Sequence, residues 1–230
     1  GIPAEPLFRS VIMGGADRVE LCRDLELDGL TPSREMIGEA VGLCHPAGLL
    51  VHVLIRSREG DFVYDDTEVK KMADEIGMAI AEGADGVVVG ALTPGGDIDT
   101  AACRKWIDAV RQAVGDQRRN VTFHRAFDVC DDPLEAIGQI ARLGCNRILT
   151  SGQQATAEQG IPLLRQLVEK AREISAKSGH ELGILCGAGV NTHNASTILK
   201  ATGATEIHGS LRTGLVSDAE KIRLVKEAIS

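Results

Sequence analysis

One short pattern recurs four times along the chain and constrains its fold more than any other feature. A glycine, a small residue and a polar residue lead into a strand-like run at 14–21, 82–89, 143–150 and 202–209. Glycine accepts the left-handed backbone conformation that follows the last turn of a helix. Each copy therefore predicts a junction at which a helix ends and a strand begins.

Three further strand-like runs, at 50–56, 121–127 and 182–186, lie between these junctions. The seven strand starts are 23 to 36 residues apart, a spacing that is typical of strand–helix units in a parallel sheet. We therefore expect a TIM (β/α)₈ barrel, which usually has about 250 residues. The alternative is a doubly wound open sheet, but no G-x-G-x-x-G follows a first strand to support it.

The start of the chain bears on how this barrel is built. Residues 4–13 have the pattern of the end of a first helix, which Gly14 and Gly15 would terminate, and no strand-like run precedes them. We expect that the first barrel strand is absent from this chain. No linker, low-complexity segment or change in composition interrupts residues 1–230, so we expect a single domain.

Capping residues mark the predicted helix starts. Thr31 before Pro32 and Asp132 before Pro133 each place a capping oxygen ahead of a proline at the first helical position. Asp65 begins a further helix, and Ser217 with Glu220 has the spacing of a capping box that opens the last helix. These positions predict where four of the helices begin.

Composition narrows the class of function. The chain has 26 glycines but only 3% aromatic residues, and its net charge is −8. Excess negative charge disfavours binding to nucleic acid or to an anionic membrane, and no apolar run is long enough to span a bilayer. The first residues do not resemble a secretory signal. Six scattered cysteines without a C-x-x-C motif predict free thiols in a reducing, cytoplasmic setting.

The alternation of side chains along the predicted strands places an unusually polar set inside the barrel. Apolar residues such as Val51 and Val53 should face the helices, because side chains alternate along a strand. The other face should point inward, and it carries Glu20, Cys22, His52, Arg56, His124, Glu206, His208 and Ser210. The charged residues near the amino ends of their strands could have a purely structural role. They could form ion pairs that only close the barrel, since buried charges must be paired.

The residues at the carboxyl ends of the strands are candidates for function, because barrel active sites lie at that end. Glu20 or His124 could serve as a general acid or base, with Asp128 nearby in the sequence. Arg56 and Arg125 could hold a carboxylate or a phosphate. The loops after the last two strands, with the glycines and hydroxyl groups nearby, predict an anion site; its candidate residues are Gly187, Gly189, Ser151 and Ser210.

Several motifs together resemble the CutC copper homeostasis family. They are G-G-A-D-R-V-E-L-C at 14–22, G-L-T-P-S at 29–33, I-R-S-R-E-G-D-F at 55–62, G-A-D-G at 83–86 with G-A-L-T at 90–93, T-F-H-R-A-F-D at 122–128, L-T-S-G at 149–152 and G-A-T-E-I-H at 203–208. The resemblance covers nearly the whole chain, in order.

This resemblance implies a cytosolic TIM barrel that forms a homodimer or a higher homo-oligomer and that binds copper. In that family the copper site is expected at cysteines that end the first two strands. Cys22 matches the second of these, and the first would fall at or just before Gly1. Cys22 is therefore the candidate metal ligand.

Three functions remain open on the sequence. The first is a copper homeostasis protein that binds Cu(I), since soft thiolate ligands select that ion. The second is a barrel enzyme that acts on a small substrate bearing a phosphate or a carboxylate. The third is a scaffold whose polar interior is purely structural.

Overall fold

The computed structural model describes residues 4–114, 119–214 and 216–230. Within these residues, seven strands form one parallel sheet in which each strand pairs with the next along the chain. The strands are β1 (Arg18–Leu21), β2 (Leu50–Leu54), β3 (Gly86–Val89), β4 (Asn120–Phe123), β5 (Arg147–Thr150), β6 (Gly183–Cys186) and β7 (Glu206–Ile207). Each strand starts within about one residue of its predicted position, so the parallel strand–helix repeat is confirmed.

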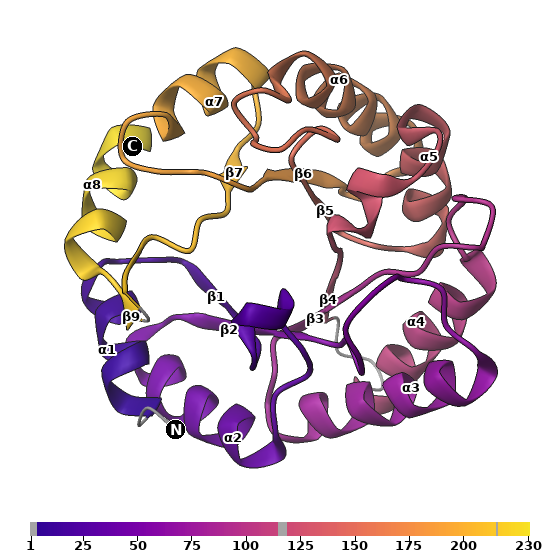
Figure 1. The fold of residues 1–230 in the computed structure, drawn as a ribbon, viewed down its shortest axis with the longest axis horizontal. Helices are drawn as coiled ribbons and strands as arrows, with labels where there is room; N and C mark the ends of the chain where they lie inside the picture. Colours follow the sequence, from indigo (N-terminus) through magenta and orange to yellow (C-terminus); the bar gives the residue numbers. More distant parts are fainter. Residues whose placement is uncertain (1–3, 115–118, 215) are drawn as a thin grey trace.

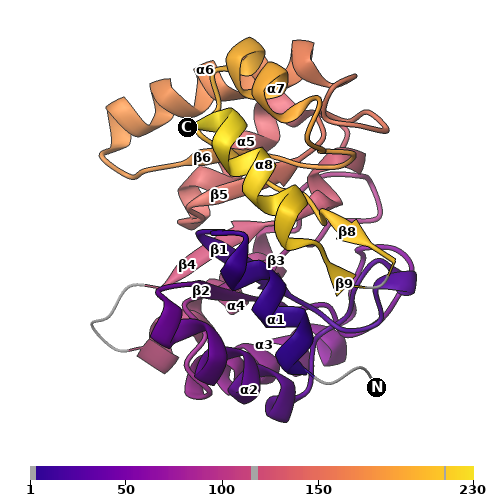
Figure 2. The same ribbon diagram turned by 90° about the vertical axis from the view of Figure 1, so that its left-hand side faces the viewer.

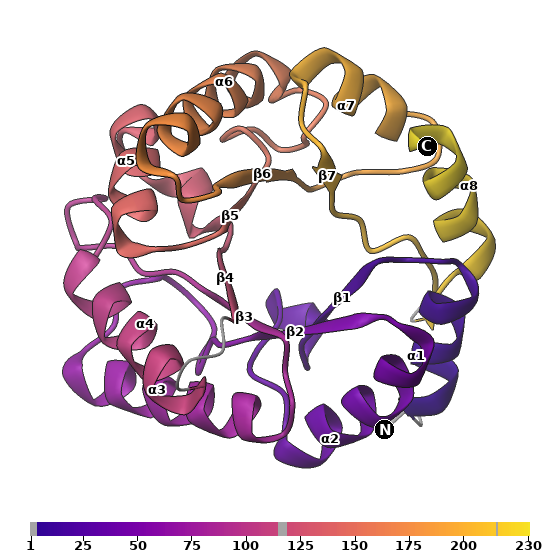
Figure 3. The same cartoon turned by 180° about the vertical axis from the view of Figure 1, so that it is seen from behind.

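Helices surround the curled sheet as an outer ring, which Figures 1 and 3 show from its two ends. The α-helices are α1 (Ala4–Met13), α2 (Arg34–Cys44), α3 (Asp66–Ala81), α4 (Thr100–Val114), α5 (Pro133–Leu143), α6 (Ile161–Ser178), α7 (Ala195–Thr202) and α8 (Ala219–Ile229). A short hairpin, β8 (Arg212–Thr213) with β9 (Val216–Ser217), precedes the last helix. This arrangement is the predicted α/β barrel. Among the described helices, none has both the length and the apolar character to cross a membrane.

The curled sheet has two edges, β1 and β7, which are not paired with each other. Helices α1 and α8 pack together outside these edges, and Figure 2 shows them from that side. The described residues contain no strand before β1. Gly1, where the other family cysteine was expected to fall, lies outside the described residues.

The predicted alternation of side chains is visible in β2. Val51, Val53 and Ile55 belong to the apolar core between sheet and helices. His52, between them, lines a cavity inside the barrel together with Thr122 of β4. In β2 the apolar groups thus face the helices, while the inner face carries His52; in β3 and β6, Val88 and Leu185 also line the cavity.

Two of the four predicted helix caps are confirmed and two are wrong. Asp65 and Glu68 form a capping box at the start of α3, and the Asp132 carboxylate accepts from two backbone N–H groups of α5. The cap of α8 is Asp218 and not Ser217, because Ser217 is paired with Arg212 in the β8–β9 hairpin. The cap of α2 is Ser33 and not Thr31. The Thr31 hydroxyl instead donates to Glu75 at 2.7 Å and accepts from the backbone N–H of Arg56 at 2.9 Å. The hydroxyl thus connects the loop after β1 to Arg56, which follows β2. It is therefore not available to cap α2.

Candidate functional site at the carboxyl ends of the strands

Backbone strain concentrates in the loops that follow the strands. Among the described residues, five that are not glycine have positive φ angles, and all five lie in such loops: Asp24, Asp28, Gln153, Ala188 and Leu211. A side chain in this left-handed region costs energy, and such residues cluster at ligand and catalytic sites. The strain therefore marks the end of the barrel at which function was expected.

The Asp128 carboxylate joins the loops that follow β4 and β5. It accepts from the Thr150 hydroxyl at 2.5 Å and from the Ser151 backbone N–H at 3.0 Å. Arg125 pairs with it through Nε at 2.7 Å and reaches the Ser151 hydroxyl at 3.4 Å. Asp128 is almost fully buried, whereas the Arg125 side chain is 46% exposed. The carboxylate thus holds a cationic group at the open rim of the barrel.

His124 is buried and electrically neutral. Burial, with help from the nearby Arg56 charge, lowers the pKa of His124 to about 3. Its Nδ1 accepts a hydrogen bond from the Ala126 backbone N–H at 3.1 Å. The proton of the neutral ring must therefore lie on Nε2, and that atom has no hydrogen-bond partner among the described residues.

Arg56 is also buried, and its terminal nitrogens donate only to backbone carbonyls. One Nη donates to Leu27 at 2.8 Å and to Gly29 at 3.1 Å, and the other donates to Gly60 at 2.9 Å. This guanidinium fastens the loops after β1 and β2 to each other. Its Nε has no partner.

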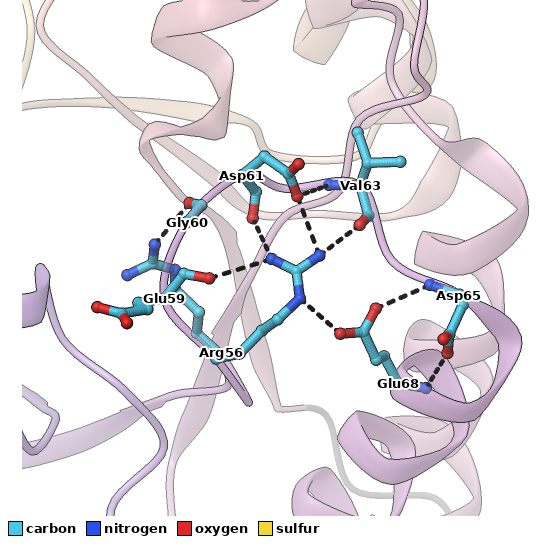
Figure 4. Close-up of polar contacts among 8 residues, drawn as sticks. Arg56, Glu59, Gly60, Asp61, Val63, Asp65 and Glu68 are labelled. Atoms are coloured by element: carbon cyan, nitrogen blue, oxygen red, sulfur yellow. Dashed lines mark hydrogen bonds and ion pairs between the residues drawn. The ribbon is translucent and has the colours of Figure 1, made fainter.

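A second arginine makes the loop after β2 rigid. Arg58 donates to the Glu68 carboxylate at 2.5 Å, to the Asp61 carboxylate at 3.0 Å and to the Val63 carbonyl at 2.5 Å. In Figure 4, Asp61, Val63 and Glu68 surround an arginine side chain that carries no label of its own, and these contacts identify it as Arg58. These contacts fix the loop that carries Phe62.

Phe62 and Tyr64 belong to this rim, although the sequence reasoning did not identify them. The Phe62 ring lies 5.0 Å from the His124 ring, centre to centre, and the Arg56 guanidinium lies 5.3 Å from the Phe62 ring centre. Tyr64 is buried, and within the described part of the chain its hydroxyl has no partner of good hydrogen-bonding geometry. The available signal was the placement of two of only six aromatic residues within a short, arginine-rich segment.

A second group of predicted residues lies on the opposite side, between β1 and β7. A cavity of about 500 Å³ opens there, and its wall includes Glu20, Cys22, His208 and Ser210. His208 Nδ1 lies 3.9 Å from a Glu20 carboxylate oxygen. Burial and the neighbouring Glu20 charge raise the pKa of the Cys22 thiol to about 11. The structure thus brings Glu20 and His208 together and places Cys22 on the same wall.

Lower in the barrel, Glu206 bridges two arginines. Its carboxylate accepts from Arg18 at 2.7 Å and from Arg147 at 2.6 Å. His52 lies nearby, and burial together with these two positive charges lowers its pKa to about 3. These residues form the structural ion pairs that were expected low in the strands.

The predicted anion-site residues occupy different environments. The Gly187 N–H donates to the Thr150 carbonyl at 3.0 Å, and the Ser151 hydroxyl donates to the Gln154 carbonyl at 2.6 Å. Gly189 has a φ of 67°, and Ser210 is exposed. Their role in binding an anion stays a prediction.

The chain offers few ligands for a metal. In the part of the chain that the structure describes, no group of three or more His, Cys, Asp or Glu side chains is arranged to hold an ion. Of the six cysteines, five are buried and only Cys22 is partly exposed. One thiol with an imidazole on the same cavity wall suits a soft ion such as Cu(I) better than tetrahedral zinc.

Comparison with known proteins decides the family. A sequence model of the CutC family matches residues 6–213. The chain belongs to the CutC family. A CutC family protein from Bacteroides thetaiotaomicron is 48% identical over 205 residues, 89% of this chain and 76% of the relative. One from Pasteurella multocida is 45% identical over 194 residues, 84% of this chain and 73% of the relative.

Solved structures agree with this assignment. A candidate copper homeostasis protein CutC from Streptococcus agalactiae has a TM-score of 0.76 at 36% identity, covering 84% of this chain and 88% of that chain. A 3-hexulose-6-phosphate synthase from Salmonella typhimurium has a TM-score of 0.67 at 16% identity, covering 98% of this chain and 92% of that one. The second likeness concerns the fold alone. Both support a barrel of the TIM type.

Proposed function

We propose that this CutC family member acts in copper homeostasis by binding Cu(I) through Cys22, in the cytosol. The observation that carries the proposal is the position of Cys22. It is the only one of the six cysteines that is not buried, and it lies in the wall of the 500 Å³ cavity. A thiolate is the side-chain ligand that selects Cu(I).

His208 is the second ligand in this proposal, because it lines the same cavity and lies beside Glu20. A single thiolate would leave the coordination of a soft ion incomplete, and an imidazole nitrogen can complete it. Glu20 would orient the ring by accepting from its other nitrogen, as carboxylates do for metal-bound histidines. The name of the Streptococcus agalactiae relative supports a role connected with copper.

The experiment is an anaerobic Cu(I) titration in competition with a coloured chelator. Cys22→Ser should abolish the tight binding of one equivalent of Cu(I), and His208→Gln should weaken that binding. Cys186→Ala is the matched control, since Cys186 also ends a strand but is fully buried. Unchanged stoichiometry and affinity in Cys22→Ser would exclude Cys22 as the ligand.

A second candidate function is that of a barrel enzyme that binds and converts a small anion at the rim of the barrel. The observation that favours it is Arg125, whose half-exposed guanidinium is held in place by the buried Asp128 carboxylate. A guanidinium fixed in this way is suited to a carboxylate or a phosphate. His124 provides a neutral imidazole nearby, on the preceding residue.

Thermal unfolding with a panel of small carboxylates and phosphates tests this second function. An anion that binds the folded protein raises its melting temperature, and Arg125→Gln should abolish that rise. The control is Arg104→Gln, which removes an exposed arginine from α4. Equal stabilisation of all three proteins would contradict a role for Arg125.

A further inference from the structure

Three buried polar atoms without hydrogen-bond partners gather beside the loop after β2. They are Arg56 Nε, Tyr64 Oη and His124 Nε2, and their side chains are 5%, 7% and 5% exposed. Nearly all buried polar groups in folded proteins are paired, because an unpaired one loses its bond to water. Three such atoms around one loop therefore require a physical explanation.

Contacts show that the three groups are neighbours. Arg56 and His124 both lie against the Phe62 ring, at 5.3 and 5.0 Å from its centre. Arg56 also influences Tyr64: burial raises the pKa of Tyr64, and the Arg56 charge opposes that rise. A hydrogen bond from the guanidinium also lowers the pKa of Tyr64, so the two groups are close together, although in the described residues the hydroxyl has no partner of good hydrogen-bonding geometry. Arg56 is thus the common neighbour of the other two.

The charge of Arg56 has no counter-ion. Among the described residues, no carboxylate lies within ion-pairing distance of its guanidinium, which bonds only to the carbonyls of Leu27, Gly29 and Gly60. A buried charge without an opposite charge is unfavourable. The face of Phe62 offers a weak cation–π attraction, which replaces only part of an ion pair.

All three unpartnered atoms can donate a hydrogen bond. The guanidinium Nε–H is a donor only, and the neutral His124 ring carries its proton on Nε2, because Nδ1 already accepts from Ala126. The Tyr64 hydroxyl can donate as well. A group that satisfies all of them must present several acceptor oxygens and a negative charge.

We propose that Arg56, Tyr64 and His124 form a buried pocket for one carboxylate group, and that Phe62 fills this pocket when no carboxylate is bound. The proposal rests on the second candidate function, since it places the inner end of an anionic ligand beneath the rim that Arg125 occupies. One cation beside a neutral imidazole matches a monoanion, so a carboxylate is favoured over a doubly charged phosphate.

Phe62 is the residue that must move, because it contacts both Arg56 and His124 and is only partly buried. The frame of its loop stays fixed, since Arg58 holds Glu68, Asp61 and Val63 (Figure 4) and the Phe62 carbonyl accepts from Leu92 at 2.9 Å. Rotation of the Phe62 side chain, rather than opening of the loop, therefore gives access to the pocket.

Imidazole nitrogen spectra of ¹⁵N-labelled protein test the proposal. The titrants are sodium acetate and inorganic phosphate, with sodium chloride at matched ionic strength as control. Acetate should shift the His124 Nε2 signal in a saturable way, and the His180 ring, which contacts the Cys145 carbonyl, should not respond. His124→Gln assigns the signal. Phosphate acting more strongly than acetate would overturn the choice of a carboxylate.

Two variants separate the pocket from the rim. Tyr64→Phe keeps the ring and removes one donor, so acetate should bind about tenfold more weakly, while Phe62→Ala should bind it more tightly. If acetate leaves the His124 signal unmoved in wild type and in Phe62→Ala, a buried water only satisfies these donors and the pocket is rejected. If Arg125→Gln abolishes acetate binding and Tyr64→Phe does not alter it, the rim function stands and the pocket fails.

Discussion

The His124 ring lies so close to the α-carbon of Gly90 that a methyl group there would come within 2.5 Å of Cε1 and Nδ1. The two residues follow β3 and β4, whose last residues, Val89 and Phe123, are paired. The same relationship recurs lower in β3, where a methyl group on Gly86 would come within 2.9 Å of the His52 ring. Glycines of one strand thus make room for the histidines of its neighbours.

Gly90→Ala should therefore displace His124 and destabilise the protein. The neighbouring ring is packed on all sides, and overpacking of this kind typically costs about 1–3 kcal/mol. The free energy of unfolding in urea measures the loss. Gly77→Ala is the control: Gly77 lies within α3, and nothing lies within 4 Å of an added methyl group. That change should stabilise the protein by about 0.4–1 kcal/mol, and an equal loss in both variants would contradict the steric argument.

The sequence predicts this framework but not its inner contacts. Strand positions follow from glycine junctions and alternation, both of which depend on residues close together in the chain. The pairing of His124 with Gly90, or of Glu206 with Arg18 and Arg147, joins residues that are distant in the chain. Phe62 was missed for the same reason, since its importance depends on lying against His124 and Arg56.

A second prediction concerns acid. The pKa values of His52 and His124 are lowered from 6.5 to about 3 in the folded protein, whereas the unfolded chain gains these protons near pH 6.5. The unfolded state therefore binds more protons between these values, and stability falls as pH falls from about 6.5 to 3. Each histidine contributes up to about 1.4 kcal/mol per pH unit.

The His124→Gln variant lacks the contribution of His124 to this pH dependence. Its free energy of unfolding should therefore fall less steeply than that of wild type between pH 6.5 and 4.5. The matched control is His193→Gln, because the His193 side chain is exposed and its ring meets water in both states. This control should follow the wild-type curve. A wild-type slope in His124→Gln would show that His124 is not buried neutral.

A third prediction concerns the carboxylate that bridges Arg18 and Arg147. Burial alone would raise the pKa of Glu206, but its bonds to the two arginines leave that pKa lowered. Glu206→Gln leaves two guanidinium charges without their partner. The expected loss in the free energy of unfolding is about 2 kcal/mol, which lies between the values for exposed and for buried ion pairs. Urea unfolding at pH 7 measures it.

The control for Glu206 is Glu220→Gln on α8, which removes an exposed partner of Arg223 and should change stability little. Because the Glu206 pKa is lowered, its contribution is present at neutral pH and is lost as pH falls through the folded-state pKa. The difference between wild type and Glu206→Gln should therefore shrink in acid. A difference that persists when the carboxyl is protonated would indicate a packing effect instead.

The last prediction concerns how pH acts on Cu(I) binding. The Cys22 pKa is about 11, raised first by burial and then by Glu20, while Arg212 opposes the rise. At neutral pH the thiol is protonated, so Cu(I) must displace a proton to bind. Apparent affinity should rise about tenfold per pH unit from pH 6.5 to 8.5, measured by competition with a chelator of known pH dependence. Arg212→Gln removes a positive charge that favours the Cys22 thiolate and should weaken binding at pH 7. Affinity that does not change with pH would show that no thiol proton is released, and Cys22 would not be the ligand.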